Sequence, residues 1–199
     1  MCKIITITSP TASGKDSILK RVIEKSKEEN LNVEFVLSTT SRPMREGEKQ
    51  GVEYNFISYE ECLNKLYKDK TFIESRIYNT ECGLWIYGIE NTSIDILSDK
   101  VYIIIIDFNG LLQLERYCEL NNIELKSFYI DCKNSTRLER SLKREPNASD
   151  KQILEMCRRI ISDNDIVLPA KYYVDEVLVN EQHCDINHCV NTILEECRK

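Results

Sequence analysis

The chain has 199 residues, of which 42% are hydrophobic and 30% charged, and its net charge is −6. This size and composition predict one globular domain with a sizeable core, and the acidic balance argues against a broad surface for nucleic acid. The longest apolar run, Val101 to Ile106, is too short to cross a membrane, and Met1 leads into a strand without a signal peptide. We therefore expect a cytoplasmic protein that binds neither nucleic acid nor membranes.

The nine cysteines are scattered and form no C-x-x-C pair. This argues against a disulfide framework or a zinc ribbon. The spacing of His183-Cys184 and His188-Cys189 does not place both pairs on one helical face, as helical zinc ligands require. We expect ordinary thiols, none of which acts as a nucleophile.

The first two predicted elements flank a loop of small residues. Ile4 to Thr8 is expected to be the central, buried strand, and a helix is expected from Ser17 to about Ser26. A strand, a small-residue loop, Gly-Lys and a helix are the context of a phosphate-binding P-loop, in which backbone N–H groups hold phosphates and the lysine bonds the outer ones. The predicted nucleotide-binding residues are Ser9, Pro10, Thr11, Ala12, Ser13, Gly14, Lys15, Asp16 and Ser17.

This loop departs from G-x-x-x-x-G-K-[ST] at two positions. Ser9 replaces the first glycine, and Asp16 replaces the hydroxyl that binds magnesium. At ~4 Å and an effective dielectric near 20, a carboxylate repels one phosphate charge by about 4 kcal/mol. With Mg²⁺ between them the same carboxylate is a good ligand. Asp16 is therefore either a metal ligand or a group that weakens phosphate binding, and Ser17 is a substitute hydroxyl.

A second phosphate-binding signal follows the predicted strand Val33 to Leu37. The segment from Ser38 to Phe56 gathers hydroxyls, arginines and an acid in a loop that Gly47 and Gly51 interrupt. Guanidinium groups bind phosphate oxygens bidentately, so the segment suits a phosphate monoester, although a solvated surface loop can have the same composition. The P-loop upstream favours the phosphate site. Its predicted ligands are Ser38, Arg42, Arg45, Glu48 and Tyr54.

The two stretches together resemble the guanylate kinase family of nucleoside monophosphate kinases. That family has G-P-S-G-x-G-K-[ST] and then S-x-T-[ST]-R-x-x-R-x-G-E-x-x-G-x-x-Y-x-F, and the chain keeps every fixed position of the second pattern. The resemblance extends from Lys3 to about Asn191. It implies an α/β P-loop kinase fold, with a central parallel sheet flanked by helices. In this single domain we expect a core (1–37, 99–137 and 159–199), a monophosphate-binding arm (38–98) and a helical lid (138–158).

Within the arm, Asn55 to Ser58 is predicted as a strand and Tyr59 to Tyr67 as a short amphipathic helix. Phe72-Ile73-Glu74 resembles the family's F-[IVL]-E, whose acid accepts hydrogen bonds from N1 and N2 of guanine. Tyr87-Gly88-Ile89 stands where the family has Y-G-[ST], a few residues later than usual, and Tyr87 is expected at the substrate. Because isoleucine cannot hydrogen-bond, one contact to the base is missing or comes from elsewhere.

The apolar run Val101 to Ile106 predicts a strand that ends in Asp107, an arrangement that can hold magnesium through water. The corresponding family strand ends [LV]-D-[IV]-D-x-Q-G. Ile105 replaces the first acid, on the metal side, and Asp107 resembles the second, which faces the guanine. We hypothesise that Asp16 supplies the carboxylate that the metal site has lost at Ile105.

The lid and the C-terminal part of the core complete the resemblance. Arg137 to Arg144 resembles the lid, with Arg140 and Arg144 as its two arginines and Arg158 or Arg159 on the next helix, although a basic solvent-facing helix is the alternative. The family's last strand ends in an asparagine near the adenine of ATP. The predicted core elements are helix Leu111 to Leu120, strand Leu125 to Ile130, strand Val174 to Asn180 and helix Asp185 to Arg198.

The resemblance implies in-line transfer of the γ-phosphoryl group of ATP to GMP or dGMP, with Mg²⁺, by a monomer or homodimer. Lys15 would neutralise the ATP phosphates, and Arg140, Arg144 and Arg158 would stabilise the transition state. Two alternatives stay open. Gly-Lys-Asp-Ser also occurs in related kinases that act on ribose bisphosphates, and the altered P-loop is compatible with a catalytically inactive binding module.

Overall fold

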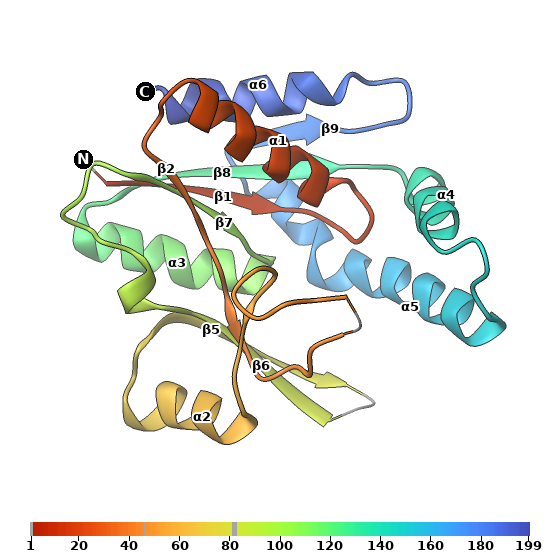
Figure 1. Cartoon of the computed structure of the whole chain (residues 1–199), viewed down its shortest axis with the longest axis horizontal. Helices are drawn as coiled ribbons and strands as arrows, with labels where there is room; N and C mark the ends of the chain where they lie inside the picture. The colour runs from red at the N-terminus through yellow and green to blue at the C-terminus, as the bar shows by residue number, and fades with distance from the viewer. Residues whose placement is uncertain (1, 46, 81–82) are drawn as a thin grey trace.

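The computed structural model describes residues 2–45, 47–80 and 83–199 (Figure 1). Its main sheet has five parallel strands in the order β2-β7-β1-β8-β9. All six residues of the central strand β1 are buried, which confirms the expected strand. The strands are β1 (Lys3–Thr8), β2 (Val33–Val36), β7 (Val101–Ile105), β8 (Glu124–Asp131) and β9 (Glu176–Val179).

Helices cover both faces of this sheet, as in a P-loop kinase fold (Figure 1). Helices α1 (Lys15–Glu28) and α6 (Ile186–Cys197) lie on one face, and α3 (Phe108–Asn121) lies on the other. The apolar residues of α1 and α6 pack in one core cluster with β1, whereas those of α3 pack in a second cluster. Helices α1 and α3 begin a few residues before their predicted starts at Ser17 and Leu111. Lys15 and Phe108 are already their first helical residues.

A second sheet of four strands forms the arm, in the order β4-β3-β6-β5. Its main part is an antiparallel hairpin of β5 and β6 with a register shift between Phe72 and Glu74. The predicted helix Tyr59 to Tyr67 is present as α2 (Tyr59–Leu63) followed by the π-helical turn Asn64–Lys68. The strands are β3 (Thr39–Thr40), β4 (Asn55–Phe56), β5 (Phe72–Thr80) and β6 (Gly83–Glu90), and a 3₁₀ turn (Asn91–Ser93) follows.

Two helices, α4 (Asn134–Arg144) and α5 (Asp150–Ile166), form the lid region, which extends to one side of the core in Figure 1. Both helices run past the predicted lid limits of 138 and 158. A 3₁₀ turn (Leu168–Tyr172) then returns the chain to β9. Within the described ranges, no helix has the length and apolar character needed to cross a membrane.

Candidate active site

The P-loop lies between the carboxyl end of β1 and the first turn of α1. Gly14 caps α1 with a φ of 93°, a left-handed conformation that glycine adopts without strain. A Cβ at this position would lie 2.4 Å from Nδ2 of Asn180, so the space also requires glycine. Ala12 is left-handed as well, with a φ of 60°. The loop is therefore held in a conformation that its neighbours must enforce.

Two side chains from distant elements fix the P-loop backbone at one carbonyl group. Asn180 Nδ2 donates to the carbonyl oxygen of Ser13 at 2.7 Å, and Arg140 Nη1 donates to the same oxygen at 3.1 Å. The N–H groups of the first turn of α1 have no partners within the helix and can bind an anion. The structure thus gives Asn180 a role in positioning the P-loop, and its contact with adenine stays a prediction.

The lid helices are attached to the same loop at Thr11. Arg137, whose side chain is buried, donates from Nε to the carbonyl oxygen of Thr11 at 2.8 Å and forms an ion pair with Asp163. Asp163 Oδ2 also accepts from the N–H of Thr11 at 2.8 Å. Arg137 and Asp163 therefore connect α4, α5 and the P-loop. Asp163 was not predicted as a site residue, because no sequence motif connects an acid so far along the chain with the P-loop.

Lys15 and Asp16 form an ion pair at the mouth of the P-loop. Lys15 Nζ lies 3.0 Å from both carboxylate oxygens of Asp16, whose side chain is 77% exposed. A carboxylate on an accessible loop fits Mg²⁺, which is usually bound by one or two carboxylates together with substrate phosphates. No group of three or more His, Cys, Asp and Glu residues able to hold a metal occurs in the described part of the chain.

Arg42 is the buried centre of the predicted monophosphate loop. Its side chain is 3% exposed, and Nη2 lies 2.8 Å from Oε1 of Glu48. The guanidinium carbon lies 5.4 Å from the ring centroids of Tyr54 and of Phe56. Burial works against the charged form, but the hydrogen bond that Arg42 donates to Glu48 raises the pKa of Arg42. Arg42 is therefore a fully charged group held in one orientation.

Glu48 also orients the second arginine of this loop. Its Oε2 accepts from the backbone N–H of Arg45 at 2.7 Å. Partial burial lowers the pKa of Arg45, and the positive charges of Arg42 and Arg159 lower it further. Guanidinium groups from the arm and from α5 therefore concentrate positive charge around Arg45. Burial raises the pKa of Tyr54, so its hydroxyl stays protonated and can donate to a phosphate.

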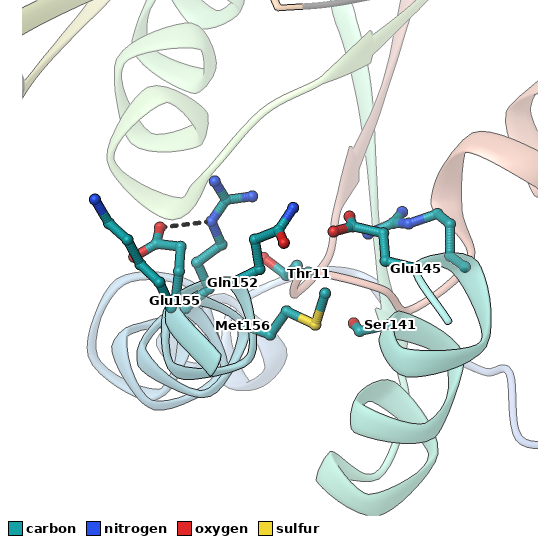
Figure 2. Close-up of a pocket in the computed structure, with 9 residues that line it drawn as sticks. Thr11, Ser141, Glu145, Gln152, Glu155 and Met156 are labelled. Carbon is teal, nitrogen blue, oxygen red and sulfur yellow. Dashed lines mark hydrogen bonds and ion pairs between the residues drawn. The ribbon is translucent and has the colours of Figure 1, made fainter. Parts of the chain in front are cut away.

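A cavity of about 260 Å³ lies between the P-loop and the lid helices (Figure 2). Arg144 and Arg159 line it together with Thr11, whereas Arg158 does not. Glu155 binds both arginines of α5, at 2.7 Å to Nε of Arg158 and at 2.9 Å to Nε of Arg159. These bonds lower the pKa of Glu155 to about 2. Arg158 and Arg159 were the two arginines of this helix considered from the sequence, and it is Arg159 that lines the cavity.

At the other end of the arm, two carboxylates enclose an arginine. Glu74 has a side chain with no exposed surface, and Arg76 Nη2 donates to its Oε1 at 3.0 Å. Arg76 Nη1 lies 4.0 Å from Oδ1 of Asp107, which caps α3 by accepting from the N–H of Gly110 at 2.9 Å. A Cβ at Gly110 would lie 2.9 Å from Oε2 of Glu74, so this close approach requires glycine. Burial raises the pKa of Glu74, and the charge of Arg76 opposes that shift.

A row of aromatic rings joins the two ends of the arm. The Tyr87 ring lies 5.7 Å from the Tyr54 ring, and the guanidinium carbon of Arg76 lies 6.0 Å from the centroid of Tyr87. Tyr54 in turn lies under Arg42. These side chains therefore form one row, with Arg42 at one end, the rings in the middle and the cluster of Glu74, Arg76 and Asp107 at the other end.

Comparisons with known proteins agree with this arrangement. The sequence pattern of the family described as guanylate kinase matches residues 1–197. The chain belongs to the guanylate kinase family. Guanylate kinase from Campylobacter jejuni strain RM1221 is 29% identical over 174 residues, which is 80% of each chain, and that from Mycoplasma mobile is 37% identical over 124 residues, or 61% of this chain and 57% of the relative. The crystal structure of guanylate kinase from Anaplasma phagocytophilum has a TM-score of 0.63 at 22% identity and covers 98% of this chain and 84% of that one.

As a guanylate kinase family member, the chain is a nucleoside monophosphate kinase, which confirms the expected family and fold. The structure brings the predicted monophosphate ligands together around Arg42, with Ser38 buried at the start of the loop. It also brings Glu74 and Asp107 to one cluster. Arg76 was not among the predicted site residues. The signal was available, because residues two apart on a strand share one face, and Arg76 is two residues from Glu74.

Proposed function

We propose that the chain transfers the γ-phosphoryl group of ATP to GMP or dGMP by in-line displacement, with Mg²⁺ as cofactor. One observation supports this most strongly. The arm carries a buried, oriented guanidinium group at one end and the buried carboxylate of Glu74 at the other, where Asp107 approaches from the start of α3, and the rings of Tyr54 and Tyr87 lie between them. A guanine nucleotide has the matching order, with a phosphate at one end and two N–H donors at the other.

The P-loop would hold the donor nucleotide. The N–H groups of the first turn of α1 would bind its phosphates, and Lys15 would exchange Asp16 for a phosphate oxygen. Asp16, with Ser17 beside it, would be the protein ligand of the metal ion, which when bound neutralises charge on the outer phosphates. Phosphoryl transfer needs little beyond this positioning and charge stabilisation, and no residue of the chain has to form a covalent intermediate.

The lid arginines would stabilise the charge that develops during transfer. Arg140 already contacts the P-loop at Ser13, and Arg144 and Arg159 line the cavity next to Thr11. Glu155 holds Arg159 and Arg158 when no phosphate competes for them. We propose that closure of the lid over both nucleotides moves the guanidinium group of Arg159 from Glu155 to the phosphates and excludes water. The same proposal includes action in the cytoplasm as a monomer or homodimer.

An assay of ADP release tests this function. The protein is supplied with ATP and Mg²⁺ and with GMP, dGMP, AMP, CMP, UMP or ribose 1,5-bisphosphate as acceptor, and Lys15→Met is the control. Turnover confined to guanine acceptors, and lost in the control, is the expected result. Turnover with another acceptor would refute the base assignment. A folded protein with no turnover on any acceptor would refute the proposed activity and favour a binding module.

A further inference from the structure

Arg76 is a buried cation that neither the P-loop nor the monophosphate loop uses. It lies on β5 with 9% of its side chain exposed, between Glu74 and Asp107. Its Nε lies 3.0 Å from Oε2 of Glu74, but the two groups are not aligned as a hydrogen bond. Within the described ranges, its guanidinium group makes one hydrogen bond, from Nη2 to Oε1 of Glu74. Most of its donors are therefore available to another partner.

Three buried polar atoms of this cluster lack hydrogen-bond partners among the described residues. They are Oε2 of Glu74, Nε of Arg76 and Oδ2 of Asp107. Buried polar atoms in proteins are nearly always hydrogen-bonded, and leaving one unpaired is destabilising. Two of the three, Nε of Arg76 and Oε2 of Glu74, lie 3.0 Å apart as an ion pair without hydrogen-bond alignment, and Oδ2 of Asp107 has no partner, so a ligand with matching donors and acceptors could complete the cluster. That ligand must donate to two carboxylates and accept from a guanidinium group along one edge.

The Watson–Crick edge of guanine has this pattern. It presents the O6 acceptor, the N1–H donor and the N2–H donors in sequence, whereas adenine presents a donor at N6 and an acceptor at N1. Two carboxylates alone could bind only the two donors of guanine. A guanidinium group between them adds the missing donor for O6, and arginine is the side chain that most often contacts guanine O6 in nucleic-acid recognition.

We propose that Arg76 is a specificity-determining residue, whose guanidinium group donates to O6 of the acceptor guanine while Glu74 and Asp107 accept from N1–H and N2–H. This inference rests on the proposed function. The position of Arg76 supports it, because its guanidinium carbon lies 6.0 Å from the Tyr87 ring, at the far end of the aromatic row from Arg42. The role also accounts for Ile89, which is fully buried in the core cluster of α3 and cannot contact a base by hydrogen bonding.

A pair of acceptors that differ only at position 6 tests the role of Arg76. GMP and 6-thio-GMP share N1–H and N2–H, but the thiocarbonyl sulfur is a weaker hydrogen-bond acceptor than O6. The ratio of their kcat/KM values is measured for the wild type, Arg76→Met and Arg76→Lys. Arg198→Met is the matched control, because it removes an arginine at the end of α6 from a surface ion pair with Glu29 at the end of α1.

We expect the wild type and Arg198→Met to prefer GMP over 6-thio-GMP by about 10-fold or more. Arg76→Met should lower kcat/KM for GMP by about 10- to 100-fold, abolish the preference and leave the KM for ATP unchanged. Arg76→Lys, which keeps the charge, should fold even if the methionine variant does not, and should keep only part of the preference.

Three outcomes would overturn the inference. If both substrates lost activity equally in the variants, Arg76 would be only a counter-ion for Glu74. A gain in GMP turnover in Arg76→Met would show that Arg76 blocks the carboxylates. A wild type that turns over another acceptor but not GMP would refute the proposed function itself, and the inference with it.

Discussion

Replacing Arg42 by alanine tests the monophosphate site at its most buried group. The side chain is 3% exposed and its partner Glu48 17% exposed, so water screens this ion pair little. The pair with Glu48 exists with and without substrate, so the effect on the acceptor KM comes from the charge pair that Arg42 would form with the phosphate, and removing one partner of such a pair costs about 2–5 kcal/mol. Because Arg45 of the same loop would still bind the phosphate, we expect the lower half of that range. At 1.4 kcal/mol per factor of ten, a loss of about 2–3 kcal/mol corresponds to an increase of about 30- to 150-fold in the acceptor KM.

The assay is steady-state ADP release with GMP varied at saturating ATP, together with the thermal midpoint of each variant. Arg42→Ala should also lower the midpoint, because the guanidinium group packs between the rings of Tyr54 and Phe56. Arg42→Lys is the matched control. It keeps the charge but not the planar fork, and we expect an intermediate KM. If folded Arg42→Ala keeps the wild-type acceptor KM, Arg42 does not bind the phosphate and the reasoning fails.

Three further changes test other parts of the molecule. Gly14→Ala places a Cβ 2.4 Å from Nδ2 of Asn180 at a φ of 93°. We therefore expect a higher KM for ATP and a loss of about 1–2 kcal/mol in the free energy of unfolding. A variant that matches the wild type in both quantities would contradict the P-loop geometry. The pKa of Glu155 is lowered from 4.5 to about 2, so its stabilisation is present above pH 4.5 and is lost as pH falls towards 2. The side chain of Glu155 is 41% exposed, so solvent screens its ion pairs. Over that pH range, the free energies of unfolding of the wild type and Glu155→Gln, measured by chemical denaturation, should differ by less than about 1 kcal/mol. A larger difference would mean that the ion pairs are less screened than their exposure indicates. Burial raises the pKa of Cys118 to about 12, so iodoacetamide at pH 8 should alkylate the partly exposed Cys184 first, as mass spectrometry would show; the reverse order would contradict the burial of Cys118.

The features predicted well from the sequence are those whose partners are close along the chain. The monophosphate loop contains Arg42, Glu48 and Tyr54 within one segment, and these residues do contact one another in the structure. The P-loop is likewise a continuous segment between a strand and a helix. In both cases the spacing of residue types already limits which groups can meet.

The features that the sequence did not predict depend on how distant elements pack. Asp163 meets the P-loop only because α5 returns to Thr11, and Arg76 meets Asp107 only because β5 packs against the start of α3. The choice between Arg158 and Arg159 depends on the rotation of α5, which neighbouring arginines do not reveal. Asn180 reaches the carbonyl oxygen of Ser13 because it directly follows β9, whose place in the sheet is not apparent from the sequence.

The ion pair of Lys15 and Asp16 has a consequence for how nucleotides approach the P-loop. Because the carboxylate already neutralises the lysine, this pair adds little net positive field of its own for a distant anion. The chain as a whole carries a net charge of −6, so its long-range field repels a nucleotide. Dissolved salt screens that repulsion beyond about 10 Å at 0.1 M. The association rate of ATP should therefore stay constant or rise with ionic strength, since capture depends on short-range hydrogen bonds from backbone amides.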